Sequence, residues 1–172
     1  HPDPAFRLQT TAELVAERFP GARFVVPLAD ARFRSLIAGG LQGSTVCATI
    51  VEEDWHRAFL LMDAALCASG TATLELALLG VPSVIVYRTS LPTYWLGRSL
   101  VSVRSIGLPN IVADEPFLPE LIQGACRPDR MAEELEAILS RPARREALRE
   151  KCLALRERLG GEGPYEAAAG ML

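Results

Sequence analysis

Residues Leu66–Tyr87 read LCASGTATLELALLGVPSVIVY, and this stretch predicts a strand, a tight turn, a helix and a second strand. The apolar run over residues 63–68 is typical of a buried strand, and it ends at a Ser-Gly-Thr turn. A helical pattern then covers Ala72–Leu79, stops at Gly80 and leads to a second apolar run over Ser83–Tyr87. This order predicts two parallel strands joined by a crossover helix.

The turn Ser69-Gly70-Thr71 places small residues at the start of the helix, where a ligand can approach the backbone. Free N–H groups and the positive end of the helix dipole favour an anion there, above all a phosphate. Glu75 lies one turn into the helix, and its carboxylate would repel a phosphate, so we expect it to accept from neutral sugar hydroxyls. A phosphate at the turn and a ribose at Glu75 together indicate a nucleotide.

The same spacing also fits an ordinary strand–helix–strand unit, in which Gly70 serves only the turn and Glu75 faces solvent. The turn matches neither G-x-G-x-x-G nor G-x-x-x-x-G-K-[ST], so neither the dinucleotide fingerprint nor the P-loop fingerprint applies. The residues of this stretch leave both readings open.

Composition predicts one soluble globular domain over residues 1–172, since 49% of the 172 residues are hydrophobic and 23% are charged. The net charge of −3 gives no global case for a nucleic-acid partner. No apolar run reaches the roughly 18 residues of a membrane span, and no signal peptide is recognisable. Because the sequence opens on His1-Pro2-Asp3-Pro4 without Met, we expect a fragment whose N-terminal part is missing.

The cysteines are dispersed along the chain, with no C-x-x-C pair and no histidine cluster near them. They are predicted to be reduced, buried thiols of a cytosolic protein and not a disulfide framework or a zinc site. The four residues are Cys47, Cys67, Cys126 and Cys152.

Outside the central stretch, helices and strands alternate. Strands are predicted over residues 23–28, 45–51 and 106–113, and helices over residues 10–19 (capped by Thr10 or Thr11), 31–38, 55–61, 92–103, 119–123, 129–140 and 142–159. This alternation predicts an α/β fold with a doubly wound parallel sheet, whose ligands sit beyond the carboxyl ends of the strands. The helical tail over residues 129–172 is expected to cap the sheet.

Several other residues could contribute to a site. Asn110 in an apolar segment binds a ligand or caps a turn. Glu120 and Gln123 lie three residues apart on a predicted short helix. Either both face one site, or Glu120 is only a first-turn acid and Gln123 only a surface amide. Arg88 balances a diphosphate or is an exposed residue at the end of a strand.

Three further residue positions have simpler explanations. Tyr94-Trp95 is expected to be core, or a helix face for a partner or a membrane surface. His56, alone at a helix start, is expected at the surface. Ser69 has no paired His and Asp, so a hydrolase nucleophile is rejected.

Four segments in order resemble the lipid-A-disaccharide synthase family. They are ASGTATLELALLGVPSVIVYR (Ala68–Arg88), TYWL (Thr93–Leu96), GLPNIVA (Gly107–Ala113) and PELIQ (Pro119–Gln123). FVVPLA (Phe24–Ala29) also fits an early strand of that family's C-terminal half. Each segment alone is weak, but the ordered set is specific and extends the resemblance over nearly the whole chain.

The resemblance implies a glycosyltransferase of GT-B architecture, of which this chain is the Rossmann-like C-terminal domain that holds the UDP-sugar. The reaction would join UDP-2,3-diacylglucosamine to 2,3-diacylglucosamine 1-phosphate, in lipid A biosynthesis. The diphosphate would be held by Ser69, Gly70, Thr71, Ala72 and Thr73. Glu75 would hold the ribose, and Asn110, Glu120 and Gln123 would surround the donor sugar and nucleotide.

The resemblance also implies what the chain lacks. The acidic base is expected in the missing N-terminal domain, so no catalytic residue is assigned here. There is no Asp-x-Asp, and neither a metal nor a cofactor is predicted. Where the family often has Gly-Arg after LPN-x-x-A, this chain has Asp114-Glu115, so Arg88 is the candidate replacement cation.

The fragment alone is therefore predicted to be inactive but to bind UDP weakly. The family suggests a cytoplasmic protein peripheral to the inner membrane, with a possible homodimer. The alternatives are another UDP-GlcNAc user, such as a 2-epimerase or the muramyl N-acetylglucosaminyltransferase, and a non-catalytic nucleotide-binding module.

Overall fold

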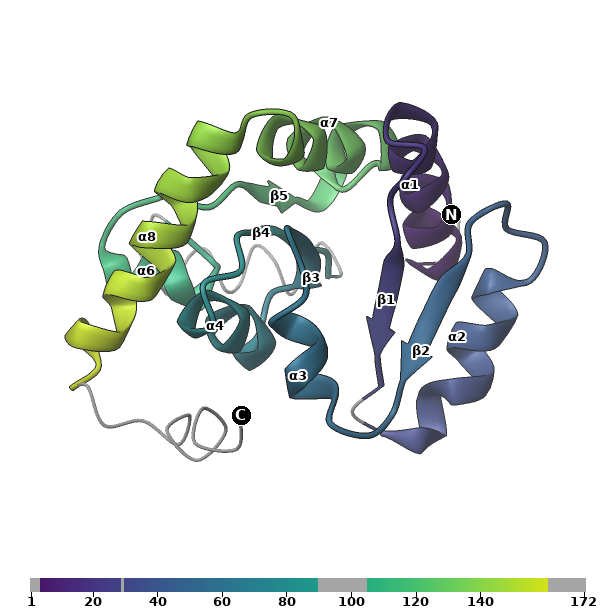
Figure 1. Cartoon of the computed structure of the whole chain (residues 1–172), viewed down its shortest axis with the longest axis horizontal. Helices are drawn as coiled ribbons and strands as arrows, with labels where there is room; N and C mark the ends of the chain where they lie inside the picture. Colours follow the sequence, from purple (N-terminus) through teal and green to yellow (C-terminus); the bar gives the residue numbers. More distant parts are fainter. Residues whose placement is uncertain (1–3, 29, 90–104, 161–172) are drawn as a thin grey trace.

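The computed structural model describes residues 4–28, 30–89 and 105–160. Within these residues, strands β1 and β2 form one parallel sheet, and β3, β4 and β5 form a second parallel sheet in that order (Figure 1). Helices α4 and α7 pack on opposite sides of the second sheet. The predicted α/β class with parallel strands is confirmed.

The first part of the chain builds the two-stranded sheet and its helices. Its elements are α1 (Pro4–Arg18), β1 (Phe24–Pro27), the 3-10 helix η1 (Ala31–Phe33), α2 (Arg34–Leu41), β2 (Ala48–Val51) and α3 (Trp55–Phe59).

The second part builds the three-stranded sheet. Its elements are β3 (Ala65–Ala68), α4 (Thr71–Leu78), β4 (Ser83–Tyr87), α6 (Leu108–Ala113), β5 (Glu120–Ile122), the 3-10 helix η2 (Gln123–Ala125), α7 (Pro128–Leu139) and α8 (Pro142–Arg158).

The β3–α4–β4 unit matches the stretch that the sequence singles out. The two strands pair in parallel, with Leu66 opposite Val84, and α4 connects them. The chain leaves α4 through Gly80, whose φ of 77° lies in the left-handed region that favours glycine. The predicted strand, turn, helix and strand are all confirmed.

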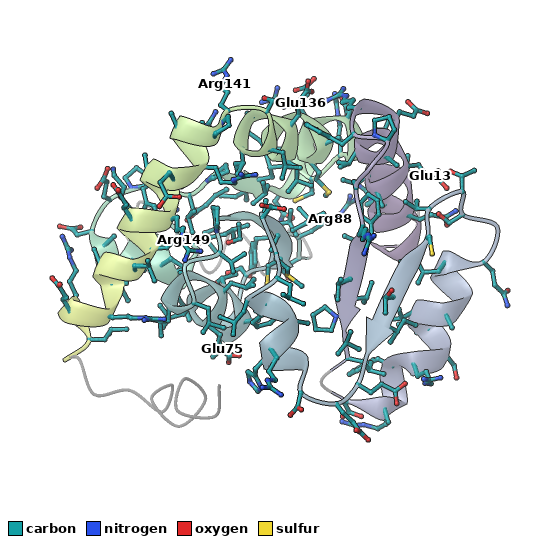
Figure 2. The ribbon with its side chains drawn as sticks, viewed as in Figure 1. Glu13, Glu75, Arg88, Glu136, Arg141 and Arg149 are labelled. Atoms are coloured by element: carbon teal, nitrogen blue, oxygen red, sulfur yellow. The ribbon has the colours of Figure 1, made fainter. Side chains whose placement is uncertain are left out.

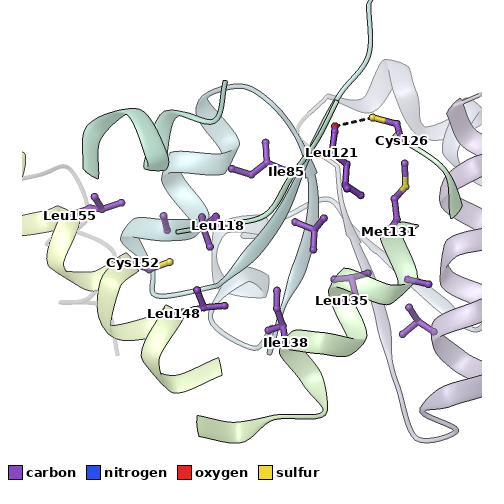
Figure 3. Packing of buried hydrophobic residues seen from close by; sticks show 14 residues of the cluster. Ile85, Leu118, Leu121, Cys126, Met131, Leu135, Ile138, Leu148, Cys152 and Leu155 are labelled. Atoms are coloured by element: carbon purple, nitrogen blue, oxygen red, sulfur yellow. Dashed lines mark hydrogen bonds between the residues drawn. The ribbon is translucent and has the colours of Figure 1, made fainter. Parts of the chain in front are cut away.

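The main hydrophobic core lies between this sheet and the C-terminal helices (Figure 3). Ile85 of β4, Ile138 of α7 and Leu155 of α8 are all almost completely excluded from solvent. Helix α7 buries one apolar stripe, as expected for an amphipathic helix on a sheet. Helix α7 thus covers the three-stranded sheet, and α8 packs against α4, α6 and α7.

The first helix begins earlier than predicted. It starts at Pro4, so neither Thr10 nor Thr11 caps it. Proline is tolerated in the first turn of a helix, where its missing N–H would have no partner. The Thr11 hydroxyl instead donates to the carbonyl of Arg7 at 2.7 Å, one turn back within the same helix.

Two predictions near the candidate site are wrong. Residues 106–113 do not form a strand broken by proline, because Leu108–Ala113 is helix α6 with Pro109 in its first turn. Residues 119–123 do not form a short helix, because Glu120–Ile122 is strand β5, paired with the end of β4. Gln123 follows this strand, so Glu120 and Gln123 share no helix.

The buried-thiol prediction is wrong for Cys47, which is exposed just before β2. The strand predicted from Thr45 begins only at Ala48, so Cys47 is outside the ladder. Cys126 and Cys152 are buried.

The predicted helix over residues 92–103, with its TYWL segment, lies outside the described residues. The end of the tail, residues 161–172, does so as well. In the part of the chain that the structure describes, no helix is both long enough and apolar enough to span a membrane.

Candidate functional site

The start of α4 is open. The Ser69 N–H donates to the Val86 carbonyl of β4, so the chain leaves the sheet at Ser69 and turns at Gly70. No side chain caps the helix. A Cβ added at Gly70 would meet nothing within 4 Å, so space lies in front of its backbone. The first amides of an α-helix have no partner within the helix, so this end can bind an anion.

Two of the three hydroxyls at this turn already have partners. The Ser69 Oγ donates to the Ile106 carbonyl at 3.1 Å, and the buried Thr73 Oγ1 donates to the Gly70 carbonyl at 2.6 Å. Thr71 is exposed at the first helical position. The groups available to a ligand are therefore the amides of Thr71 and Ala72 and the hydroxyl of Thr71.

Glu75 lies one turn further, and one of its carboxylate oxygens lacks a donor. Its Oε2 is buried without a hydrogen-bond partner among the described residues. The Nε2 of His56 on α3 is 3.8 Å from it, which is beyond hydrogen-bond distance. A buried carboxylate oxygen without a donor is unusual, and a hydroxyl group of a bound ligand would satisfy it.

Two side chains lie near this carboxylate: the exposed imidazole of His56 on α3 and the thiol of Cys67 on β3. Burial raises the pKa of the Cys67 thiol to about 11, and the negative charge of Glu75 adds to the shift. Cys67 is therefore protonated at neutral pH and is no nucleophile. His56 was predicted at the surface, and it is exposed. Its proximity to Glu75 was not predicted, because α3 and α4 are separate in sequence.

Asn110 is buried and connects α6 to the segment before β5 and to Glu120 through hydrogen bonds. It is 1% exposed, and its Nδ2 donates to the Leu118 carbonyl and to Glu120 Oε1, both at 2.8 Å. Its Oδ1 accepts from the amides of Phe117 and Leu118. A side-chain amide has two donor hydrogens and two acceptor lone pairs, so its capacity is fully used.

Glu120 holds the loop that precedes α6. Its two oxygens accept from the amides of Ile106 and Gly107, each at 2.9 Å. Because Ser69 donates to Ile106, a chain of hydrogen bonds connects the turn before α4 to Glu120 and Asn110. Three of the predicted site residues are thus brought together through one loop.

Gln123 and Arg88 follow the neighbouring strands β5 and β4. The Gln123 side chain accepts from the amide of Thr89 at 3.1 Å, and its buried Nε2 has no hydrogen-bond partner among the described residues. Its φ of 51° is strained for a residue with a Cβ, a condition that clusters at functional sites. Arg88 is exposed. Burial raises the pKa of the Cys126 thiol, and the charge of Arg88 offsets part of that rise. Figure 2 shows Arg88 and Glu75 well apart, so the structure does not join them directly.

A hollow lies at the other ends of strands β3 and β4, away from the start of α4. It measures about 220 Å³ and is bordered by Asp63, Pro82 and Arg145, with Arg145 paired to Asp63 at 3.2 Å. Pro82 and Asp63 precede β4 and β3, whereas Ser69 and Arg88 follow them. None of the predicted site residues borders this hollow. Among the described residues, no group of three His, Cys, Asp or Glu side chains is placed to hold a metal.

Comparison with known proteins identifies the family. Residues 4–167 match the family model described as lipid-A-disaccharide synthetase. Proteins named lipid-A-disaccharide synthase are similar to this chain. Those from Syntrophus aciditrophicus and Geobacter sulfurreducens are 40% and 39% identical, over 93% and 94% of the chain. The one from Myxococcus xanthus is 40% identical over 94% of the chain. The chain spans 42% of the length of each of these relatives. The chain belongs to the lipid-A-disaccharide synthetase family.

Proposed function

We propose that this chain is the UDP-sugar-binding half of a lipid-A-disaccharide synthase. The complete enzyme would transfer 2,3-diacylglucosamine from UDP to 2,3-diacylglucosamine 1-phosphate. The relatives are named for this synthase. The segments between Ala68 and Gln123 resemble the half of the family that holds the donor.

One observation carries the proposal: an uncapped helix start is followed, one turn later, by a buried carboxylate oxygen without a donor. The amides at Thr71 and Ala72 would bind the diphosphate, and the orphan oxygen of Glu75 would accept from a ribose hydroxyl. An isolated anion would satisfy only the helix start, whereas a nucleoside diphosphate satisfies both features.

The chemistry of sugar transfer fits these groups. The bond from the sugar to the diphosphate breaks, and negative charge develops on the departing UDP. Amides fixed at a helix start, with the positive end of the dipole, stabilise this charge without rearrangement. The acidic base that deprotonates the acceptor would come from the other half of the enzyme.

The remaining candidate residues would have two kinds of role. Arg88 and Gln123, after adjacent strands, would lie around the diphosphate and the sugar. Asn110 and Glu120, whose hydrogen bonds are directed to the chain itself, would hold the loop at Ile106 in place beside Ser69. Ser69 and Thr73 would shape the turn through the bonds they already make.

The finer expectations also belong to this proposal. The 172-residue chain would be inactive alone, because it would supply the donor site without the base. The complete enzyme would be cytoplasmic, peripheral to the inner membrane, and a possible homodimer. The aromatic pair Tyr94-Trp95 would be a candidate for the membrane contact.

Isothermal titration of the chain with UDP tests the proposal. We expect weak binding, and Glu75→Ala should weaken it roughly ten- to hundredfold, since a hydrogen bond to a charged group contributes about 1.5–3 kcal/mol. The matched control is Glu150→Ala, an exposed glutamate on α8, which should leave the affinity unchanged. Uridine should bind more weakly than UDP. No heat from UDP, or equal affinities for the Glu75→Ala and Glu150→Ala variants, would contradict the proposal.

A further inference from the structure

His56 of α3 lies beside the carboxylate that the proposed function assigns to the ribose. Its Nε2 is 3.8 Å from the Glu75 Oε2, the oxygen that is buried without a hydrogen-bond partner among the described residues. The two side chains belong to different helices, of which α3 follows β2 and α4 follows β3. The proposed function uses only the carboxylate, so it leaves the imidazole beside it without a role.

Packing between α3 and α4 holds His56 in this position. Phe59 lies three residues further along α3, on the same face, and its ring meets the His56 ring edge-on at a centroid distance of 6.3 Å. Phe59 is buried in one apolar cluster with Leu76, which is the residue next to Glu75 on α4. The imidazole and the carboxylate are thus brought together by buried apolar contacts around them.

An ion pair alone is a weak explanation for this arrangement. The separation of 3.8 Å exceeds hydrogen-bond distance, and 49% of the His56 side chain is exposed. Pairs with so much exposure contribute little to stability, because water screens the two charges. An ion pair at this distance also leaves the buried Oε2 of Glu75 without a donor.

The two atoms define what a group between them must do. A carboxylate oxygen only accepts hydrogen bonds, whereas an imidazole Nε2 that carries a proton donates one. A hydroxyl group does both, so a single hydroxyl can donate to Glu75 and accept from His56. One hydroxyl oxygen can lie about 2.8 Å from both atoms, because their separation of 3.8 Å is less than twice that distance. An ionised phosphate cannot donate, and the carboxylate would repel it.

A ligand hydroxyl reaches the buried oxygen only after a neighbouring side chain moves. Cys67 lies in the ladder between β3 and β4 and packs against the cluster that contains Phe59, so it is held in place. His56 is half exposed on a helix of five residues. Side chains with this exposure change rotamer rapidly. We therefore expect the imidazole to turn away from Glu75, admit the hydroxyl and donate to it.

We propose that His56 is a second ribose-binding residue, whose Nε2–H donates to the same sugar hydroxyl that donates to Glu75. This role rests on the proposed function, because it requires a nucleotide at the start of α4. It adds a source of specificity. Without the hydroxyl, both the carboxylate oxygen and the imidazole N–H would lose their partner, so the pair would favour a ribonucleotide over its deoxy form.

Calorimetric titration of the 172-residue chain with UDP and with 2′,3′-dideoxyuridine diphosphate tests the proposal. His56→Phe keeps a ring beside Phe59 but removes the donor. It should weaken UDP binding about three- to tenfold and leave the affinity for the dideoxy nucleotide unchanged.

Two further variants separate the hydrogen bond from other effects. His56→Gln supplies a neutral amide donor, so its UDP affinity should stay within about twofold of that of the unsubstituted chain. The matched control is His1→Ala, which removes the other of the two histidines and should change neither affinity.

Three results would overturn the role of His56: unchanged UDP affinity in His56→Phe, equal losses in His56→Phe and His56→Gln, or equal losses for UDP and the dideoxy nucleotide in His56→Phe. If UDP does not bind the unsubstituted chain, the proposed function and the role of His56 both fail. If Glu75→Ala weakens UDP binding and His56→Phe does not, the proposed function stands and only the role of His56 fails.

Discussion

The two sheets of this protein differ in how they are buried. The three-stranded sheet lies between α4 and α7, and α8 packs on α4, α6 and α7. Every buried member of the main core except Val15 comes from residue 77 or later. In the two-stranded sheet, β1 has no fully buried residue, α2 has none, and Phe33 and Leu36 are more than half exposed. The same chain thus contains one sheet with a packed core and one that is only partly covered.

The largest predicted contrast is in core truncation. Ile138→Ala on α7 removes a completely buried side chain and should lower the free energy of unfolding by about 3 kcal/mol. Leu36→Ala on α2 removes a side chain that is 59% exposed and should change it by less than about 0.5 kcal/mol. Urea denaturation measures both, and similar losses would contradict the contrast.

Buried polar groups should show the next largest effect. Asn110→Ala leaves two amides and a carbonyl of the 117–118 segment without partners and should lower the free energy of unfolding by about 2–3 kcal/mol. Ser44, in the first part of the chain, donates to Glu13 and accepts from the Val46 amide, both at 3.2 Å. Ser44→Ala should have an effect of about 0.5–1 kcal/mol. An equal or larger loss from Ser44→Ala would reverse the comparison.

Glycine substitutions should have opposite signs in the two regions. A Cβ at Gly107 would lie 2.3 Å from the Ile85 Cδ1 and 3.1 Å from the Glu120 Oε1, so Gly107→Ala should destabilise by about 1–3 kcal/mol. A Cβ at Gly39 in α2 meets nothing within 4 Å, so Gly39→Ala should stabilise by about 0.5–1 kcal/mol. Thermal unfolding measures both variants. If both substitutions lowered the unfolding temperature, Gly39 would lie in a packed part of α2, contrary to this prediction.

The remaining prediction concerns pH. Burial raises the pKa of Cys67 to about 11 and that of Cys152 to about 12, from an ordinary value of 9.0. Between pH 9 and 11, the unfolded chain loses these protons before the folded chain does, so the free energy of unfolding falls as pH rises. The slope approaches about 1.4 kcal/mol per pH unit for each thiol.

The Cys67→Ala variant should therefore lose less stability between pH 9 and 11 than the unsubstituted chain. Cys47→Ala, which removes an exposed thiol, is the matched control. Urea midpoints across this range measure both, and identical profiles for all three proteins would exclude the effect.

Hydrophobic periodicity and turn residues predicted most of the elements, above all the β3–α4–β4 unit. They failed at Pro109, because a proline can either interrupt a strand or occupy the first turn of a helix. Pro109 lies in the first turn of α6, where the N–H that proline lacks would have no partner within the helix. They failed again at β5, whose three residues become a strand only by pairing with β4. Short strands of this kind are decided by tertiary contacts and not by local pattern.

Only the parts of the candidate site that are local in sequence were predictable. The turn and Glu75 are local in sequence, so spacing revealed them. The bonds of Asn110 to Glu120 and of Ser69 to Ile106 join residues that only the fold brings together. The proximity of His56 to Glu75 likewise gave no local signal.

The most direct test of the central claim follows backbone amide resonances of the chain as UDP is added. We expect the amide resonances of Thr71, Ala72 and Glu75 to shift together in proportion to bound UDP, while those at Asp63 and Arg145 do not respond. Shifts confined to Asp63 and Arg145, or none at the start of α4, would contradict the claim that this helix holds the diphosphate.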